Sequence, residues 1–314
     1  EYELAHRKLD KEKGEFDKQL IKLVERFQVF YELGSWEYMR IIPVRGDDSD
    51  KWYNPFTQAV QKERELFTAT IEYFSNLGES IQTKNYDAAD KSLDKLLAMQ
   101  RTVAGKIAPS ASKIKLEVRY NKMNIFKNSQ NSYLLFGFVL LIIFLVRILS
   151  NNSGKEGKGI RIVKRVFTIL TAIIFVYHGA GLGMRWYISG HAPWSNGYEA
   201  VVFIAWVTVI AGFIFSKKNP VILAATCILA FCMLFVTEMN ILDPEITPLV
   251  PVLKSYWLMI HVAIITGSYG FLGLGAILGL INLLLYIFRN KKNGRVITWN
   301  INELTYVSEM TITI

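Results

Sequence analysis

Long apolar stretches in the second half of the sequence most constrain what it can fold into. Five occur, at residues 133–149, 166–184, 199–215, 220–236 and 256–288. A helix that crosses the hydrocarbon core of a bilayer needs about 20 such residues, with a range near 17–25. Because lipid offers no hydrogen bonds to the backbone, these stretches can cross it only as helices or as a closed barrel. The sequence therefore predicts about five membrane-spanning helices, followed by a C-terminal segment that we expect to be truncated.

The charges between these stretches predict the orientation of the chain. One alternate set of connections, 147–165, 216–219 and 289–295, carries twelve Lys and Arg residues, whereas the opposite set carries only Arg185 and Lys254. Positively charged connections stay on the cytoplasmic side of a membrane. We therefore expect the residues before the first span to lie outside, on the periplasmic face.

The last stretch is longer than one crossing requires. Residues 256–288 contain no charged side chain, and as a helix they extend about 50 Å, against about 30 Å for the hydrocarbon core. His261 lies 28 residues before Arg289, so this helix must project or bend, with His261 at or beyond the outer interface. Small residues allow close helix packing, which we expect along its inner part at Gly267, Gly270, Gly273, Gly275 and Gly279.

The first part of the chain shows helical periodicity. Apolar residues recur at three- and four-residue steps over 1–33, and a loop is expected over 35–54. Further helices are predicted over 55–76 and about 85–105, and another from Ser112 that leads into the first span. No alternation of apolar and polar residues indicates a β-strand in this part of the chain. The predicted fold class is all-α, with an extracytoplasmic helical domain over 1–128 and a polytopic membrane domain over 129–314.

Composition excludes several classes of protein. The chain is 51% hydrophobic, with a mean hydropathy of +0.23. This composition excludes a disordered chain and is more hydrophobic than that of most soluble enzymes. Its net charge of +9 is concentrated in the apolar half and forms no basic stripe for nucleic acid. No P-loop, GxGxxG, HExxH or nucleophile elbow occurs. Cys227 and Cys232 fit neither a metal clip nor a CxxCH haem-attachment sequence, so we expect both to be buried.

Three of the four histidines have open or simple interpretations. His6, on a charged helix, is expected to be solvated. His178 lies in the outer half of a predicted span, where it is either a functional ionisable group or an interhelical hydrogen-bonding partner. His191 lies in the outer loop 189–200; loop histidines are usually solvated, but this loop is dense in groups able to fix a ligand.

The fourth histidine, His261, is the strongest candidate for a metal ligand. A neutral imidazole is a good ligand for iron, and a histidine at the membrane face is accessible to a large flat cofactor. Trp257 lies one turn earlier on the same helix face and is placed to cover a porphyrin edge. The alternative is an aromatic-belt tryptophan beside a histidine that bonds to lipid headgroups.

Two segments resemble a known family. RWYISGHAPWSNGYE at 185–199 and SYWLMIHV at 255–262 resemble the membrane domain of System II cytochrome c synthases, the CcsA/ResC proteins, often fused as CcsBA. KLEVRYNKMNIF at 115–126 is similar to the junction of fused forms from the Bacteroidetes group. The resemblance implies that residues before the first span are the late part of a CcsB-like portion in the same polypeptide.

The resemblance also implies a function and a site. Such proteins carry reduced haem b to the outer face of the bacterial inner membrane and present it to the CxxCH of an apocytochrome c, where two thioethers form. His261 matches the first of two outer histidines that ligate haem iron on either side of a tryptophan-rich WWD segment. The remaining haem contacts that we expect are Trp257, Arg185 (to a propionate), Trp194, Asn196, Tyr198 and Glu199.

The WWD segment and the family's later histidines do not occur in these 314 residues. We therefore expect that these 314 residues do not attach haem on their own. Two alternatives stay open: a haem-binding or haem-delivery protein without lyase activity, similar to HemX, and a membrane-anchored scaffold of cytochrome c assembly. Arg185 also has a simpler interpretation, as a charge in the headgroup layer.

The predicted orientation can be tested by cysteine labelling in intact cells. In a background without Cys227 and Cys232, Asp48→Cys should react with an impermeant thiol reagent and Asn293→Cys should not, because only position 48 is expected outside. Labelling at position 293 but not at position 48 would overturn the assignment.

Overall fold

The computed structural model describes residues 3, 6, 12–46, 51–105, 108–149, 157–216, 219–239, 241–246, 255–290 and 293–313. The chain divides into two compact units, residues 1–110 and 111–314. Helices make up nearly all of the regular structure, which confirms the all-α fold class. The unit boundary lies before the predicted domain boundary at 128, because the helix that follows Ser110 packs within the second unit.

Among its described residues, the first unit contains the α-helices α2 (Glu15–Gly34), α3 (Arg64–Thr83) and α4 (Asp87–Ala104). The helices α3 and α4 pack against each other around a small core that includes Ile42, Val60, Leu66 and Leu96. By contrast, α2 buries none of its residues, and its apolar stripe is exposed. The predicted helix over 1–33 is found from Glu15 onward; residues 7–11 lie outside the described residues, and His6 is exposed, as expected.

Two expectations for this unit were wrong. The predicted loop over 35–54 contains a strand, β1 (Ile42–Pro43), which pairs antiparallel with β2 (Trp52–Tyr53). Strands of two residues are too short to produce a recognisable alternation. The helix predicted from Pro55 is instead a short 3-10 helix, η1 (Gln58–Lys62), and α3 begins only at Arg64.

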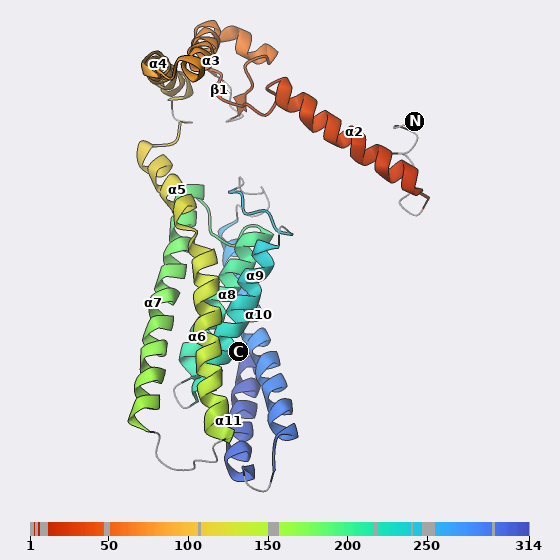
Figure 1. The fold of residues 1–314 in the computed structure, drawn as a ribbon, viewed down its shortest axis with the longest axis vertical. Coiled ribbons are helices and arrows are strands. Elements are labelled where there is room, and N and C mark those ends of the chain that lie inside the picture. The colour runs from red at the N-terminus through yellow and green to blue at the C-terminus, as the bar shows by residue number, and fades with distance from the viewer. Residues whose placement is uncertain are drawn as a thin grey trace. The chain divides into compact units, whose positions relative to one another are not determined.

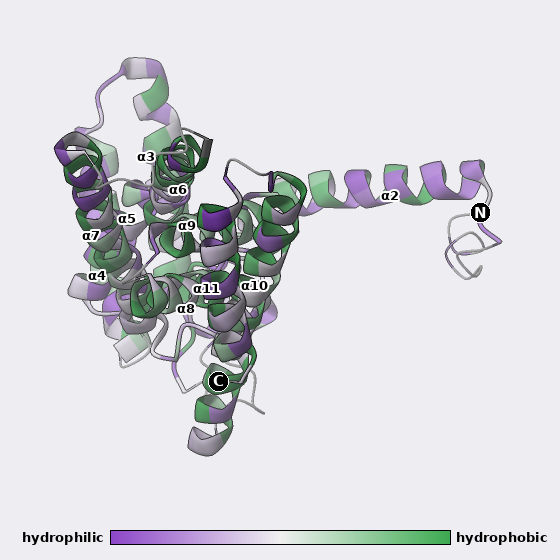
Figure 2. Ribbon diagram, turned by 90° about the horizontal axis from the view of Figure 1, so that it is seen from below, coloured by the Kyte–Doolittle hydropathy of each residue, from purple (hydrophilic) through white to green (hydrophobic). Residues whose placement is uncertain are grey.

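The second unit is a helical bundle. It comprises α5 (Ala111–Met123), α6 (Ile125–Leu149), α7 (Lys158–Ser189), α8 (Gly197–Phe215), α9 (Pro220–Glu238), α10 (Tyr256–Ile287) and α11 (Gly294–Thr313). Helix α9 packs against both α6 and α8, α7 lies alongside α6, and α10 packs between α8 and α11 (Figure 1). Apolar residues predominate in α6, α8, α9 and α10, whereas hydrophilic and hydrophobic residues alternate along α2 (Figure 2). We call the end where α7 finishes and α8 and α10 begin the upper end.

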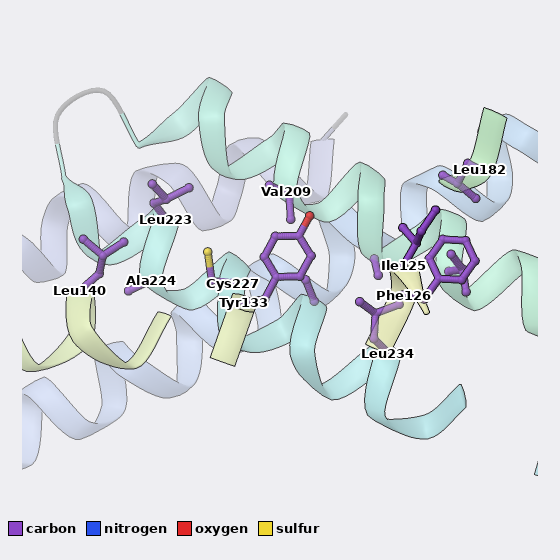
Figure 3. Packing of buried hydrophobic residues seen from close by; sticks show 13 residues of the cluster. Ile125, Phe126, Tyr133, Leu140, Leu182, Val209, Leu223, Ala224, Cys227 and Leu234 are labelled. Atoms are coloured by element: carbon purple, nitrogen blue, oxygen red, sulfur yellow. The ribbon is translucent and has the colours of Figure 1, made fainter. Parts of the chain in front are cut away.

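One cluster of the bundle core extends over α10 and α11, and another is built mainly from side chains of α6, α8 and α9. Figure 3 shows Tyr133, Val209 and Cys227 directed into it, each fully buried. Cys227 is therefore buried as predicted, but the same expectation for Cys232 was wrong, since that residue is exposed. Five residues at 3.6 per turn rotate a side chain by about 140°, so the two cysteines lie on different faces of α9.

In the part of the chain that the structure describes, four helical segments are long and apolar enough to cross a membrane: Ala111–Ile148, Gly197–Phe215, Pro220–Glu238 and Tyr256–Ile287. Together with the all-helical bundle they make this a multi-pass membrane protein. The predicted span 166–184 lies within α7 and is not one of these four, so the count of five stays a prediction. Asn293 is only 7% exposed, which makes the exposed Arg295 a better position for the labelling experiment.

Helix α10 runs unbroken through the stretch that the sequence marked as too long for one crossing. Three of its glycines allow close approach of neighbours: Gly270 to α8, Gly273 to α9 and Gly275 to α11. A β-carbon at Gly270 would lie 2.7 Å from Thr208 Oγ1 and 3.2 Å from the carbonyl oxygen of Ile204. At Gly279, by contrast, a β-carbon would meet no described atom within 4 Å.

These two glycines give a matched test of bundle packing. Gly270→Ala should lower the thermal stability of the detergent-purified protein, because overpacking costs about 1–3 kcal/mol. Gly279→Ala should be neutral or stabilising, since alanine is favoured over glycine in a helix by about 1 kcal/mol. Equal melting temperatures for the two variants would contradict the close contact between α8 and α10.

Candidate functional site

His261 lies in the second turn of α10, at the upper end of the bundle, and its side chain is exposed. Trp257, four residues earlier on the same face, is 77% exposed. Within the described residues, no group of three or more His, Cys, Asp or Glu side chains is placed to hold a metal ion. The geometry is therefore that of a single open imidazole beside an open indole, which suits an axial contact to a flat metal-bearing ring rather than a chelating ion site.

Trp194 connects the loop between α7 and α8 to the start of α10. Its indole Nε1 donates to the carbonyl oxygen of Met259 at 3.2 Å, two residues before His261. The ring packs edge-on against Trp186 of α7, at 5.9 Å between centroids, and tilted against Phe203 of α8, at 4.8 Å. The loop therefore lies directly beside the helix turn that presents His261.

The start of α8 is fixed by its own side chains. Asn196 is the N-cap, and its Oδ1 accepts from the backbone N–H of Glu199 at 2.8 Å. The Glu199 carboxylate is fully buried, and its Oε2 accepts from the backbone N–H of Ser195 at 2.9 Å. The Asn196 side chain thus satisfies one of the N–H groups that the first turn of a helix leaves free, and Glu199 binds the backbone just before the N-cap. The sequence Asn-Gly-Tyr-Glu thus sets the direction of the loop as well as that of the helix.

Arg185 is buried, with 1% of its surface exposed. Its Nε donates to Glu199 Oε1 at 2.7 Å, and its two terminal nitrogens donate to the carbonyl oxygens of Pro244 and Glu245, each at 2.8 Å. Burial, the largest single influence, lowers the pKa of this guanidinium, which lies beyond the predicted span, but the interactions with Glu199 and Tyr120 together outweigh burial and the pKa is raised. Arg185 therefore has a protein counter-ion, and its predicted contact to a haem propionate stays a prediction.

Tyr198 packs over the guanidinium of Arg185, with 5.1 Å from the guanidinium carbon to the ring centroid. On its other side it lines a cavity of about 590 Å³ together with Tyr120, Phe126 and Glu238. Of the predicted haem contacts, only Tyr198 lines this cavity. The structure thus sorts the predicted residues into three groups. His261 and Trp257 are exposed, Arg185 and Glu199 are buried with the half-buried Tyr198 packed beside them, and Trp194 and Asn196 link the loop to its neighbours.

The other two histidines of this unit are buried. His178 has no exposed surface, and its Nδ1 lies 3.3 Å from the hydroxyl of Tyr133 on α6, an interhelical contact of the kind the sequence left open. His191 is 9% exposed, with Nδ1 3.2 Å from the carbonyl oxygen of Ala192, so it is not the solvated residue that is usual in loops. No signal in the sequence pointed to Tyr133 or to the carbonyl oxygens of residues 244, 245 and 259, because a hydroxyl or a carbonyl group does not mark its partner in a sequence.

Comparison with known proteins identifies the family. Residues 194–314, from Trp194 through His261 to the end, match the model of the family described as cytochrome c assembly protein. The chain is 31% identical to the protein NrfI of Wolinella succinogenes over 283 residues. The match covers 88% of this chain and 30% of NrfI. The chain belongs to the cytochrome c biogenesis family of CcsA.

Two CcsA proteins illustrate the extent of the likeness. That of Pyropia yezoensis is 36% identical over 163 residues, which cover 50% of this chain and 49% of the relative. That of Guillardia theta is 31% identical over 170 residues, covering 51% and 56% respectively. This CcsA-family chain thus spans less than a third of NrfI and about half of each of these CcsA proteins.

The N-cap of α8 provides a direct test of the loop geometry. Asn196→Ala should lower the free energy of unfolding by about 1 kcal/mol, because Glu199 loses the side-chain acceptor of its N–H. Asn196→Ser should retain most of the stability, since serine is also a good N-cap. Thermal unfolding of the three proteins in one detergent measures the difference, and an alanine variant as stable as the parent would contradict the cap.

Proposed function

We propose that this chain is part of a membrane cytochrome c synthase that exports haem and presents it for attachment to the CxxCH of an apocytochrome c. The observation that carries the proposal is the exposed pair of His261 and Trp257, in a segment that matches the cytochrome c assembly family. Haem b, with reduced iron, is the transported substrate. The chain lies in the bacterial inner membrane, and its first unit is the periplasmic CcsB-like portion of the same polypeptide.

The residues at the upper end fit a haem. The ring has apolar faces and requires an axial nitrogen, and haem iron in proteins is commonly held by a histidine imidazole. His261 supplies the nitrogen, and the 77% exposed indole of Trp257 supplies an apolar surface on the same helix face. Trp194, held against the carbonyl of Met259, supports this turn from behind. Asn196, Tyr198 and Glu199 shape the site and take no part in bond formation.

The chemistry of attachment asks the site mainly to hold and orient the substrate. Each CxxCH thiol adds across a haem vinyl group, so that an S–C bond forms at one vinyl carbon and the thiol proton moves to the other. The side chains of this chain need supply neither the nucleophile nor the electrophile. Their contribution is to fix the iron through His261 and to cover one face of the ring, which leaves the vinyl edges open to the apocytochrome. Holding the reactants in this way lowers the entropic cost of the reaction, which free haem and a free thiol would meet in full.

The test is removal of the imidazole in the full-length protein. His261→Ala should lower copurified haem by more than about tenfold, because even the outer partners of metal ligands contribute 10–100-fold to affinity. Maturation of a reporter cytochrome c should stop, and added imidazole should restore part of it by filling the vacant coordination position. Haem content is read from the absorption spectrum, and attachment from covalent haem staining of the reporter.

The control is His6→Ala, which removes an exposed histidine from the other unit and should change neither readout. A His261→Ala protein that accumulates normally, retains its haem spectrum and matures the reporter at the parental rate would refute the ligand assignment. Loss of attachment with normal haem binding would also count against it, since it would move the role of His261 from holding iron to contacting the apocytochrome.

A further inference from the structure

We propose that Arg185 is a positioning residue: through Glu199 and the loop that carries Trp194, its guanidinium holds the first turns of α10, and with them His261, in place. This inference rests on the proposed function of His261. It differs from a contact between Arg185 and haem, because the cation acts entirely on protein groups.

Three segments of the chain meet at the guanidinium of Arg185. Arg185 belongs to α7, while Glu199 belongs to α8, and Pro244 and Glu245 belong to the connection that follows α9. All three bonds are 2.7–2.8 Å long, and the side chain is 1% exposed. The planar fork of arginine donates in several fixed directions at once, which the single ammonium group of lysine cannot do. One side chain therefore sets the separation of three segments at the upper end.

The second step is the path from Arg185 to α10. Glu199 accepts from Arg185 with Oε1 and from the N–H of Ser195 with Oε2, so the carboxylate joins the cation to the loop. Ser195 in turn donates its hydroxyl to the carbonyl of Ala192 at 2.7 Å, which closes the loop on itself. The next residue back, Trp194, donates to the carbonyl of Met259. Three hydrogen bonds, together with the peptide bond between Trp194 and Ser195, thus join the guanidinium to the carbonyl of Met259, two residues from His261.

The third step is the energetic role of the pair. A buried ion pair offers little net stability, because desolvation offsets much of the attraction, but removing one partner leaves a buried charge unpaired. Glu199 is fully buried and Arg185 almost so, which makes their geometry strict. The packing of Tyr198 over the guanidinium further limits its freedom. The arrangement therefore favours a fixed geometry over a large gain in stability.

The experiment uses the full-length protein in detergent and measures amide hydrogen exchange over 191–196 and 259–262. Arg185→Gln should speed exchange in both segments by at least about tenfold, the factor expected from the loss of one hydrogen bond to a charged group. Arg185→Lys keeps the charge but reaches fewer acceptors, so it should show a smaller increase in the same two segments. It also keeps the test valid if the glutamine variant does not accumulate.

The matched control is Lys113→Gln, which removes another cation beside the last turns of α7. Lys113 contacts the carbonyl of Ile188 at 3.4 Å and the ring of Tyr187, and the path described above does not include it. Its substitution should leave exchange in 191–196 and 259–262 at the parental rate.

A second readout separates positioning from direct contact with haem. If Arg185 acts through His261, added imidazole should restore haem binding to Arg185→Gln, as it should to His261→Ala. A propionate contact would not be replaced by imidazole, so absence of rescue in Arg185→Gln alongside rescue in His261→Ala overturns the proposal.

The exchange measurement does not depend on haem. Unchanged exchange over 259–262 in both Arg185 variants overturns the proposal whatever the haem content is. Increased exchange in both segments, together with normal haem binding by His261→Ala, would refute the proposed function while leaving the path from Arg185 to α10 in place.

Discussion

A polypeptide in lipid must satisfy its own backbone hydrogen bonds, and the second unit of this protein follows from that constraint. Once each apolar stretch is a helix, its backbone polar groups are nearly all used within the helix, and only the ends remain to be satisfied. Association of the helices then depends on shape, as where the bare backbone at Gly270 lets Thr208 and Ile204 of α8 approach α10. The same constraint explains why the buried charged pair of the bundle, Arg185 and Glu199, lies close to helix ends.

At the upper end, side chains of neighbouring segments bind several backbone groups at or near helix ends. Asn196 caps α8, Trp194 binds a carbonyl in the first turns of α10, and Arg185 binds two carbonyls of the connection after α9. Charge is added there as a neutral pair, since Glu199 accompanies Arg185. The hydrogen-bonded residues of the loop support the first turns of α10, and Trp257 and His261 are exposed on those turns. Such a surface suits a ligand that is flat, apolar on its faces and held by one coordinate bond.

The sequence predicted the features that repeat and missed those that occur once. Apolar stretches identified α8, α9 and α10 to within two residues at each end, because each involves about twenty or more side chains that obey one rule. For α6 they identified the end but not the start, since its first two turns are largely polar. The two-residue strands at Ile42 and Trp52 and the exposure of Cys232 were missed, since a pattern of that size has no statistical weight. For the site, His261 and Trp194 were found by residue type and family resemblance. Their surroundings were not, because a charged residue shows neither its burial nor its partner in a sequence.

The contact between Trp194 and residue 259 joins a side chain to a main-chain carbonyl, and this has a consequence for how the family can vary. Any residue except one that bends the helix presents the same carbonyl at position 259, so the methionine there is replaceable without loss of the bond. The tryptophan is not, because among large apolar side chains only the indole carries a donor. Relatives that retain this contact should therefore vary freely on the α10 side and hold the indole fixed on the loop side. Covariation between positions 194 and 259 would then not reveal this contact, although the structure shows it.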